Sequence, residues 1–296
     1  MGLRVKPTYR QRRFGSEVRQ LRERAGLSSS DAARLLGIKQ PQLSNVESGK
    51  TGLSPARVLQ LADAAGVKSG PFIEALNDMG QDSGKGWWTS YRKDLGESHL
   101  DLAELESGAV ALRNYELLFI PGLLQTADYA MAVHGGGYAE SVREVQNTAV
   151  EFRMERQRVL VGDHPPKLHA IIHEAALRVL YGGREVMREQ LLKLVEASRL
   201  PNVTIQVVPL EDEQRAAFNH SFMVIEPNVL ELGTVLVDQL ATAQLLGETQ
   251  AIADYTESFA RLSELALPPV DTKVAPEQRR VKDSLGLIQH ILYPLL

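Results

Sequence analysis

The first eighty residues carry apolar positions at the spacing of short helices. Phe14, Val18 and Leu21 recur every three to four residues, which predicts a helix over 14–24 that stops before Gly26. Four more helices are predicted over residues 29–36, 39–47, 54–65 and 71–79. Together these segments predict a compact bundle of five helices.

The second and third predicted helices are joined by a tight turn at Gly37. Such a turn often requires a positive φ, which glycine adopts without steric cost. The small Ala33 and the apolar Leu43 and Val46 suit the close packing of two crossed helices. Residues 28–50 therefore show a helix-turn-helix pattern.

The opposite side of the third helix is polar. It presents a lysine with amide and hydroxyl side chains, and no acid precedes Glu47: Lys39, Gln40, Gln42, Ser44 and Asn45. Amides and a lysine near the start of a helix can bind base edges and phosphates in a major groove. The alternative interpretation is a helical hairpin whose polar face is solvated. The flanking helices favour the DNA-binding interpretation.

Charge is distributed unevenly along the chain. Residues 1–80 contain 13 lysines and arginines against 7 acids, whereas the remaining residues contain 20 against 30, within a net charge of −4. A basic N-terminal segment joined to an acidic remainder is typical of a domain that binds a polyanion followed by a domain that does not bind nucleic acid.

Residues 14–79 resemble the five-helix, lambda-repressor-like DNA-binding domain of the XRE family, which includes phage Cro and cI-type repressors. The segment that carries the resemblance is ERAGLSSSDAARLLGIKQPQLSNVESGK. The resemblance implies that the third helix enters the major groove. It assigns the DNA contacts to six polar residues, with Gln40, Gln42 and Asn45 as base readers, Lys39 on phosphate or base, and Ser29 and Lys50 on phosphates.

The same resemblance implies a structural ion pair between Arg22 in the first helix and Glu47 at the end of the third. The alternative for Glu47 is a solvated helix end. One residue departs from the family pattern, because Pro41 stands where the family often has a polar residue that reads DNA. Only an apolar contact is possible at that position.

Three arginines, Arg10, Arg12 and Arg13, precede the first predicted helix as a short basic arm. The arm is expected either to touch phosphate or a minor groove, or to be a solvated, partly ordered terminus. At the other end of the bundle, GQDSGKG indicates a linker. We therefore predict a DNA-binding domain over 1–80, a linker over 81–86 and a second domain over 87–296.

The second domain mixes helical and strand patterns. Helices are predicted over 100–114, from 123, and over 141–161, 174–181, 184–198, 238–265 and 276–292. Strands are predicted over 168–173, in VTIQVVP and FMVIE, and as a pair in ELGTVLVDQ. The chain as a whole is thus predicted to be mainly α-helical with a smaller α+β component. The apolar stripe of the last helix serves either assembly or packing onto the parent domain.

This second domain resembles the large C-terminal domain of actinobacterial regulators of the WhiJ-like, antitoxin-like kind. The matching pieces are IPGLLQTADYA, HEAALRVLYGG, VMREQLLKL and PNVTIQVVP, within 87–267. The resemblance implies a transcriptional regulator, often encoded beside a small partner protein. It implies no agreed ligand or chemistry for the large domain.

Patterns typical of enzymes are missing from the sequence, which has no GxSxG, phosphate-binding glycine loop or HExxH. His169, His173 and Glu174 lie close together, but not at a standard spacing for metal ligands, so buried or solvated histidines are the preferred interpretation. The Trp87-Trp88 pair indicates a core or interdomain anchor rather than a ligand cage. We expect no catalytic residue, no metal and no cofactor.

The chain contains no cysteine, which favours a reducing compartment and a cytoplasmic protein. No apolar run approaches the roughly 18 residues needed to cross a bilayer, and no secretory signal is expected from the basic first residues. We therefore expect no membrane partner.

These features predict a regulator that binds double-stranded DNA. A single recognition helix reads few base pairs, so a homodimer on two half-sites is expected. The second domain would then bind a small partner protein or an unknown small-molecule effector. The alternative is an antitoxin-like interaction module that mainly holds a small partner protein, and an enzyme tethered to DNA is a more distant possibility.

Overall fold

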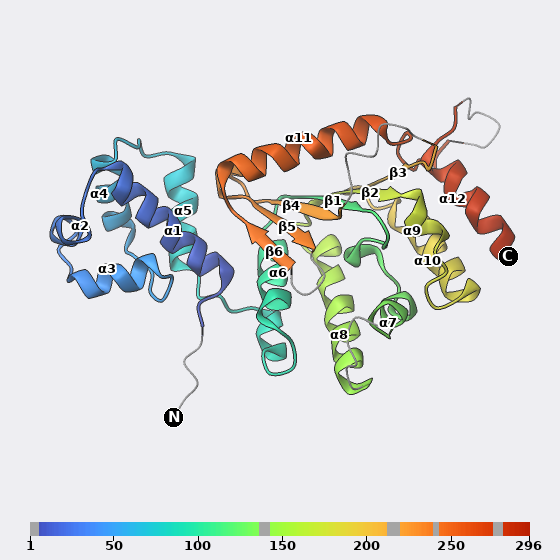
Figure 1. Cartoon of the computed structure of the whole chain (residues 1–296), viewed down its shortest axis with the longest axis horizontal. Helices are drawn as coiled ribbons and strands as arrows, with labels where there is room; N and C mark the ends of the chain where they lie inside the picture. Colours follow the sequence, from blue (N-terminus) through green and yellow to red (C-terminus); the bar gives the residue numbers. More distant parts are fainter. Residues whose placement is uncertain (1–5, 136–142, 212–219, 239–242, 275–280) are drawn as a thin grey trace. The chain divides into compact units, whose positions relative to one another are not determined.

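A computed structural model of the 296-residue chain describes residues 6–135, 143–211, 220–238, 243–274 and 281–296 (Figure 1). The chain divides into two compact units. The described part of the first contains residues 6–92, 96–105 and 228–232, and the second contains the other described residues.

The first unit is built on the five predicted helices, which are α1 (Tyr9–Arg24), α2 (Ser29–Leu35), α3 (Gln40–Glu47), α4 (Pro55–Ala64) and α5 (Pro71–Gln81). Local signals set their ends. Thr8 and Ser28 cap α1 and α2 through their side chains, and prolines open α4 and α5. A short 3-10 helix (Trp87–Tyr91) and the first part of α6 (Glu97–Ser107) complete the unit.

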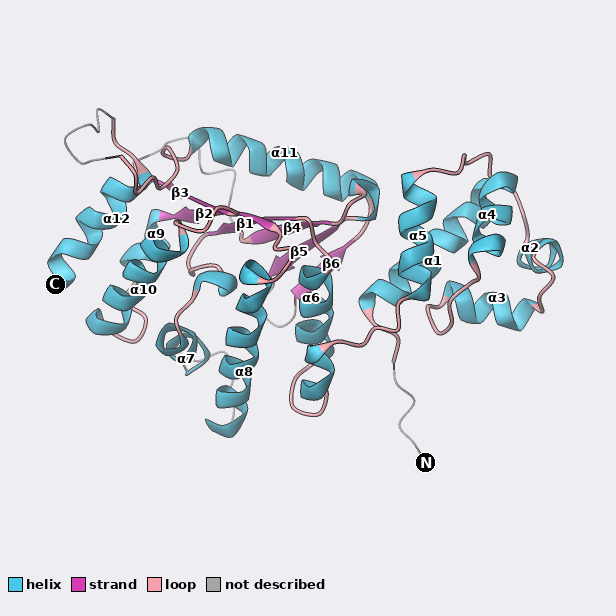
Figure 2. Ribbon diagram, turned by 180° about the vertical axis from the view of Figure 1, so that it is seen from behind, coloured by secondary structure: helices cyan, strands magenta, loops and turns pink. Residues whose placement is uncertain are grey.

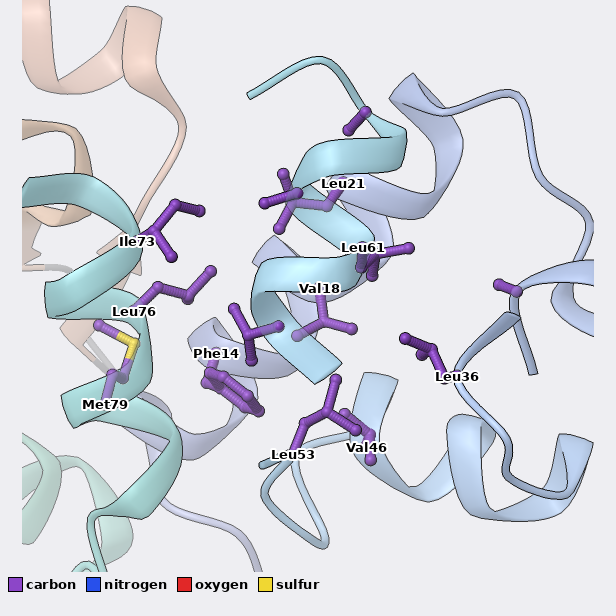
Figure 3. Close-up of a cluster of buried hydrophobic side chains, with 14 of the residues drawn as sticks. Phe14, Val18, Leu21, Leu36, Val46, Leu53, Leu61, Ile73, Leu76 and Met79 are labelled. Atoms are coloured by element: carbon purple, nitrogen blue, oxygen red, sulfur yellow. The ribbon is translucent and has the colours of Figure 1, made fainter. Parts of the chain in front are cut away.

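Side chains from the five helices meet in one apolar core (Figure 3). Val18, Leu43 and Leu76 are fully buried in it. Val229 and Leu232, which come from far along the chain, join the same core. The core of the helical bundle therefore includes two side chains that could not be predicted from the first eighty residues.

The predicted start of the first helix is wrong by five residues, because α1 begins at Tyr9 rather than at Phe14. Thr8 and Gln11 form a reciprocal capping box that begins the helix upstream of the apolar positions. Arg10, Arg12 and Arg13 consequently lie on α1 and do not form an arm.

The second unit contains a six-stranded mixed sheet in the order β3-β2-β1-β4-β5-β6. Its strands are β1 (Ala111–Glu116), β2 (Lys167–His173), β3 (Val203–Val208), β4 (Phe222–Glu226), β5 (Thr234–Asp238) and β6 (Ala243–Leu246). The first three strands run parallel, and β4, β5 and β6 are added antiparallel. The parallel connections need crossovers, which helices provide.

Helices cover both faces of this sheet (Figures 1 and 2). One face packs under α11 (Thr249–Leu265), where Tyr115, Phe222 and Phe259 are buried. The other face carries the crossover helices, which are α7 (Ala127–Gly135), α8 (Arg143–Arg156), α9 (Glu174–Arg178) and α10 (Arg184–Ala197). The prediction of a mainly helical chain with a smaller α+β component is confirmed.

Two segments of the second unit were predicted to be helical and are strands. Residues 111–114 belong to β1, whose neighbours β2 and β4 come from distant parts of the chain. Residues 243–246 form β6 against β5, so the predicted strand pair in ELGTVLVDQ supplies only one of these two strands. In both cases sheet pairing overrides the local preference.

The C-terminal segment closes one edge of the sheet. The N–H groups of Leu267 and Val270 donate to the carbonyl oxygens of Val207 and Ile205 on the edge strand β3, at 2.9 and 2.8 Å. The last helix, α12 (Ser284–Leu292), packs against α10 and β3. Residues 275–280 of the longer helix predicted here lie outside the described residues.

Candidate nucleic-acid interface

The helix pair α2 and α3 is fixed from the inside. Ala33, Leu43 and Val46 are buried, and Gly37 between the helices has a φ of +62°. The N–H of Ile38 donates to the carbonyl oxygen of Ala33 at 3.0 Å, which closes the end of α2. The polar side of α3 is thereby directed outward.

The residues predicted to contact DNA lie on α3, at its two ends and at the start of α2. Ser29 is half-buried, and the other five are exposed: Lys39, Gln40, Gln42, Asn45 and Lys50. Pro41, also exposed, lies among them. This surface offers amide and ammonium groups for base edges and phosphates.

Gln42 has a local role that the sequence did not indicate. Its Oε1 accepts a hydrogen bond of 2.8 Å from the N–H of Lys39, the N-cap residue of α3. This bond uses the amide oxygen as an acceptor. Gln42 can therefore offer its NH2 group to acceptors such as guanine O6 and N7 or a phosphate.

An ion pair ties α1 to the end of α3. Arg22 Nε lies 2.6 Å from Glu47 Oε1, and Arg22 Nη1 donates to the carbonyl oxygen of Leu27 at 3.0 Å. The two charged side chains are only 10% and 14% exposed. Solvent screens such a pair less than one on the surface.

Two glycines allow α1 and α3 to approach each other closely. A Cβ at Gly15 would lie 2.6 Å from the carbonyl oxygens of Val46 and Glu47. A Cβ at Gly49, where φ is +74°, would lie 2.7 Å from the carbonyl oxygen of Gln11. Neither close approach was predicted from the sequence, although a glycine inside a helix, such as Gly15, often marks one.

Two polar side chains of α4 support the turn before α3. Arg57 Nε donates to the carbonyl oxygen of Leu36, and Gln60 Nε2 donates to that of Leu35, both at 2.9 Å. These carbonyls lie at the C-terminal end of α2, where helices leave acceptors unsatisfied. No local pattern in the sequence indicates this long-range support.

Comparison with protein families assigns most of the chain. A helix-turn-helix domain matches residues 13–76, and a domain of unknown function (DUF5753) matches residues 100–275, which is more than half of the chain. The chain belongs to the DUF5753 family. No curated protein and no solved structure matched.

The DUF5753 domain surrounds its first loop with buried polar side chains. Gln125, which is 2% exposed, accepts from Arg153 Nη1 at 2.6 Å and donates to the carbonyl oxygen of Ile120 at 2.7 Å. Gln190 Nε2 donates to the carbonyl oxygen of Leu124 at 2.8 Å. These hydrogen bonds satisfy backbone carbonyl groups of the loop between β1 and α7, which indicates a structural role for Gln125 and Gln190.

The histidines noted in the DUF5753 domain take part in separate contacts. His169 Nε2 lies 2.6 Å from Gln206 Oε1, and burial lowers the pKa of His169. His173 accepts from the N–H of Ala175 as the N-cap of α9. Within the described ranges, no group of three histidines, aspartates or glutamates could hold a metal ion. Within those described ranges, none of the helices combines the length and the apolar composition needed to span a membrane.

Proposed function

We propose that this protein is a sequence-specific transcriptional regulator that binds double-stranded DNA through α3. The observation that carries the proposal is the outward polar surface of α3, held by a buried core within a region that matches a helix-turn-helix domain. The basic charge of residues 1–80 supports it.

In this proposal Gln40, Gln42 and Asn45 read bases, Lys39 contacts a phosphate or a base, and Ser29 and Lys50 bind phosphates. Selection of binding sites from a random DNA pool tests it. The triple alanine variant of the three base readers should lose sequence preference, at about 1–3 kcal/mol for each good bidentate contact. A lysine substitution should instead weaken binding to all sequences. An unchanged preference in the triple variant would show that another surface reads the DNA.

We further propose that the regulator acts as a homodimer in the cytoplasm. Two half-sites about one helical turn apart would supply the specificity that one short helix lacks. Light scattering that detects only monomer, combined with footprints of a single half-site, would contradict a dimer. Residues 1–80 would be the DNA-binding part, 81–86 the linker, and 87–296 the sensing and dimerisation part.

The resemblance to WhiJ-like, antitoxin-like regulators supports a small partner protein or a small-molecule effector for the DUF5753 domain. The alternative within the same resemblance is an antitoxin-like module whose main task is to hold the partner. Footprinting with and without the product of a neighbouring small gene separates the two. Release of DNA on adding that product favours partner control, and binding of the product without any effect on DNA favours the alternative.

A further inference from the structure

The first turn of α1 is bound by a carboxylate from α6. Asp101 Oδ1 accepts from the N–H of Tyr9 at 2.9 Å, and Asp101 Oδ2 accepts from Arg12 Nη2 at 3.1 Å. Both segments lie within the first compact unit. The side chain of Asp101 is 7% exposed and that of Arg12 is 46% exposed, so the pair joins a buried acid to a partly exposed cation.

Two further ion pairs surround this contact. Lys6 Nζ lies 3.1 Å from Glu97 Oε1, and Arg10 Nε lies 3.5 Å from Asp82 Oδ2. The cations thus come from α1 and the residues before it, whereas the acids come from α6 and the end of α5. The basic start of α1 is neutralised by nearby carboxylates.

Arg12 is also close to the proposed DNA-contacting surface. A Cβ placed on Gly49 would lie 2.8 Å from the Cα of Arg12, so the backbones of α1 and the end of α3 touch. Lys50, a proposed phosphate contact, directly follows Gly49. Arg12 therefore stands beside the same end of the recognition helix as Lys50.

We propose that Arg12 is a further contact to DNA phosphate and that Asp101 occupies it in the DNA-free protein. This inference rests on the proposed function. A carboxylate and a phosphate offer a guanidinium similar oxygen acceptors, so they compete for the same donors. α6 thereby restrains DNA binding, and a shift of Asp101 away from Arg12 strengthens it.

Asp101→Asn tests the restraint with little change in shape. The amide oxygen of the new asparagine can still accept from the N–H of Tyr9, while the negative charge that pairs with Arg12 is removed. Binding of the full chain to a short mixed-sequence duplex, measured by fluorescence anisotropy, should tighten on the order of fivefold. Glu257→Gln on α11 is the matched control, because it changes the net charge equally in an exposed pair with Arg261.

Arg12→Gln tests the phosphate contact without altering Asp101. Its dependence of log affinity on log salt should be shallower than that of the native chain by about 0.9, the value for one phosphate. Asp101→Asn should give no gain in the Arg12→Gln background. The salt slope of Arg12→Gln tests the phosphate contact even if Asp101→Asn fails to fold.

Any of four results would overturn the inference: an unchanged salt slope in Arg12→Gln, no gain in a folded Asp101→Asn, an equal gain from Asp101→Asn in the Arg12→Gln background, or an equal gain in Glu257→Gln. Lys50→Gln separates these failures from failure of the proposed function. If Lys50→Gln weakens binding while the Arg12 and Asp101 variants do nothing, only the inference falls. If Lys50→Gln also has no effect, the proposed interface on α3 falls with it.

Discussion

Glu104 on α6 is a buried acid whose protonation should control the stability of the first unit near neutral pH. Glu104 is only 2% exposed, and this burial raises the pKa of its carboxyl group from 4.5 to about 7. The neighbouring charges of Asp82 and Asp101 raise the pKa further, while a hydrogen bond with Thr8 and the charge of Arg10 lower it. Glu104→Gln keeps the shape and removes the titration.

The sign of the change in stability with pH follows from the number of protons bound in the folded and unfolded states. Between pH 4.5 and 7 the folded chain holds a proton on Glu104 that the unfolded chain has released. Stability from this group is therefore complete below pH 4.5 and is lost as the pH rises to about 7. At about 1.4 kcal/mol per pH unit, the free energy of unfolding should fall by about 3 kcal/mol relative to Glu104→Gln.

Urea unfolding followed by tryptophan fluorescence measures this difference. The chain has two tryptophans, Trp87 and Trp88, and both lie in the first unit, so their emission reports on that unit. The difference between the native chain and Glu104→Gln should grow from pH 5 to pH 7 and then level off. Glu264→Gln, at an exposed position, is the control for loss of a glutamate. A difference that stays constant across this range would refute the reasoning.

Three further predictions concern the packing of α1 on α3 and the sheet. Arg22→Ala leaves Glu47 without its buried partner, so the first unit should lose about 3 kcal/mol in the same fluorescence assay, and Glu47→Gln in that background should recover part of it. Gly15→Ala should cost more than Gly26→Ala, because a Cβ at Gly15 meets two carbonyl oxygens, whereas Gly26 has open space and only a φ of +68°; equal losses would contradict this. Burial lowers the pKa of His169, so the unfolded chain binds the proton first. The second unit should therefore lose stability as pH falls below 6.5, measured by circular dichroism, and His169→Gln should lessen that loss.

Local chemistry made the helical bundle predictable. Prolines and capping residues mark most of its helix starts, and the spacing of Leu43 and Val46 separates the buried side of α3 from its polar side. The start of α1 was missed because its first turn is polar and lacks an apolar repeat. Its capping pair, Thr8 and Gln11, is a weaker signal than periodicity.

Long-range contacts account for what the sequence could not supply. Two buried residues of β1, Asn114 and Glu116, are polar, so Ala111–Glu116 lacks the apolar alternation of a strand, and its partner strands follow much later in the chain. The contact of Asp101 with Arg12 spans 89 residues and leaves no local pattern. The same holds for Arg57, which contacts the end of α2 from α4.

The segment that covers β3 has a consequence for how the chain can be shortened. Leu267 and Val270 occupy the hydrogen-bonding edge of β3, and Ser284 accepts from the N–H of Val207 at 2.9 Å. A chain cut before Leu267 would present a bare strand, VTIQVV, to any neighbouring molecule. Bare strands of this composition recruit one another into aggregates. Residues 267–270 and Ser284 thus protect the exposed edge of the sheet, and a reporter is better fused after α12 than in place of this segment.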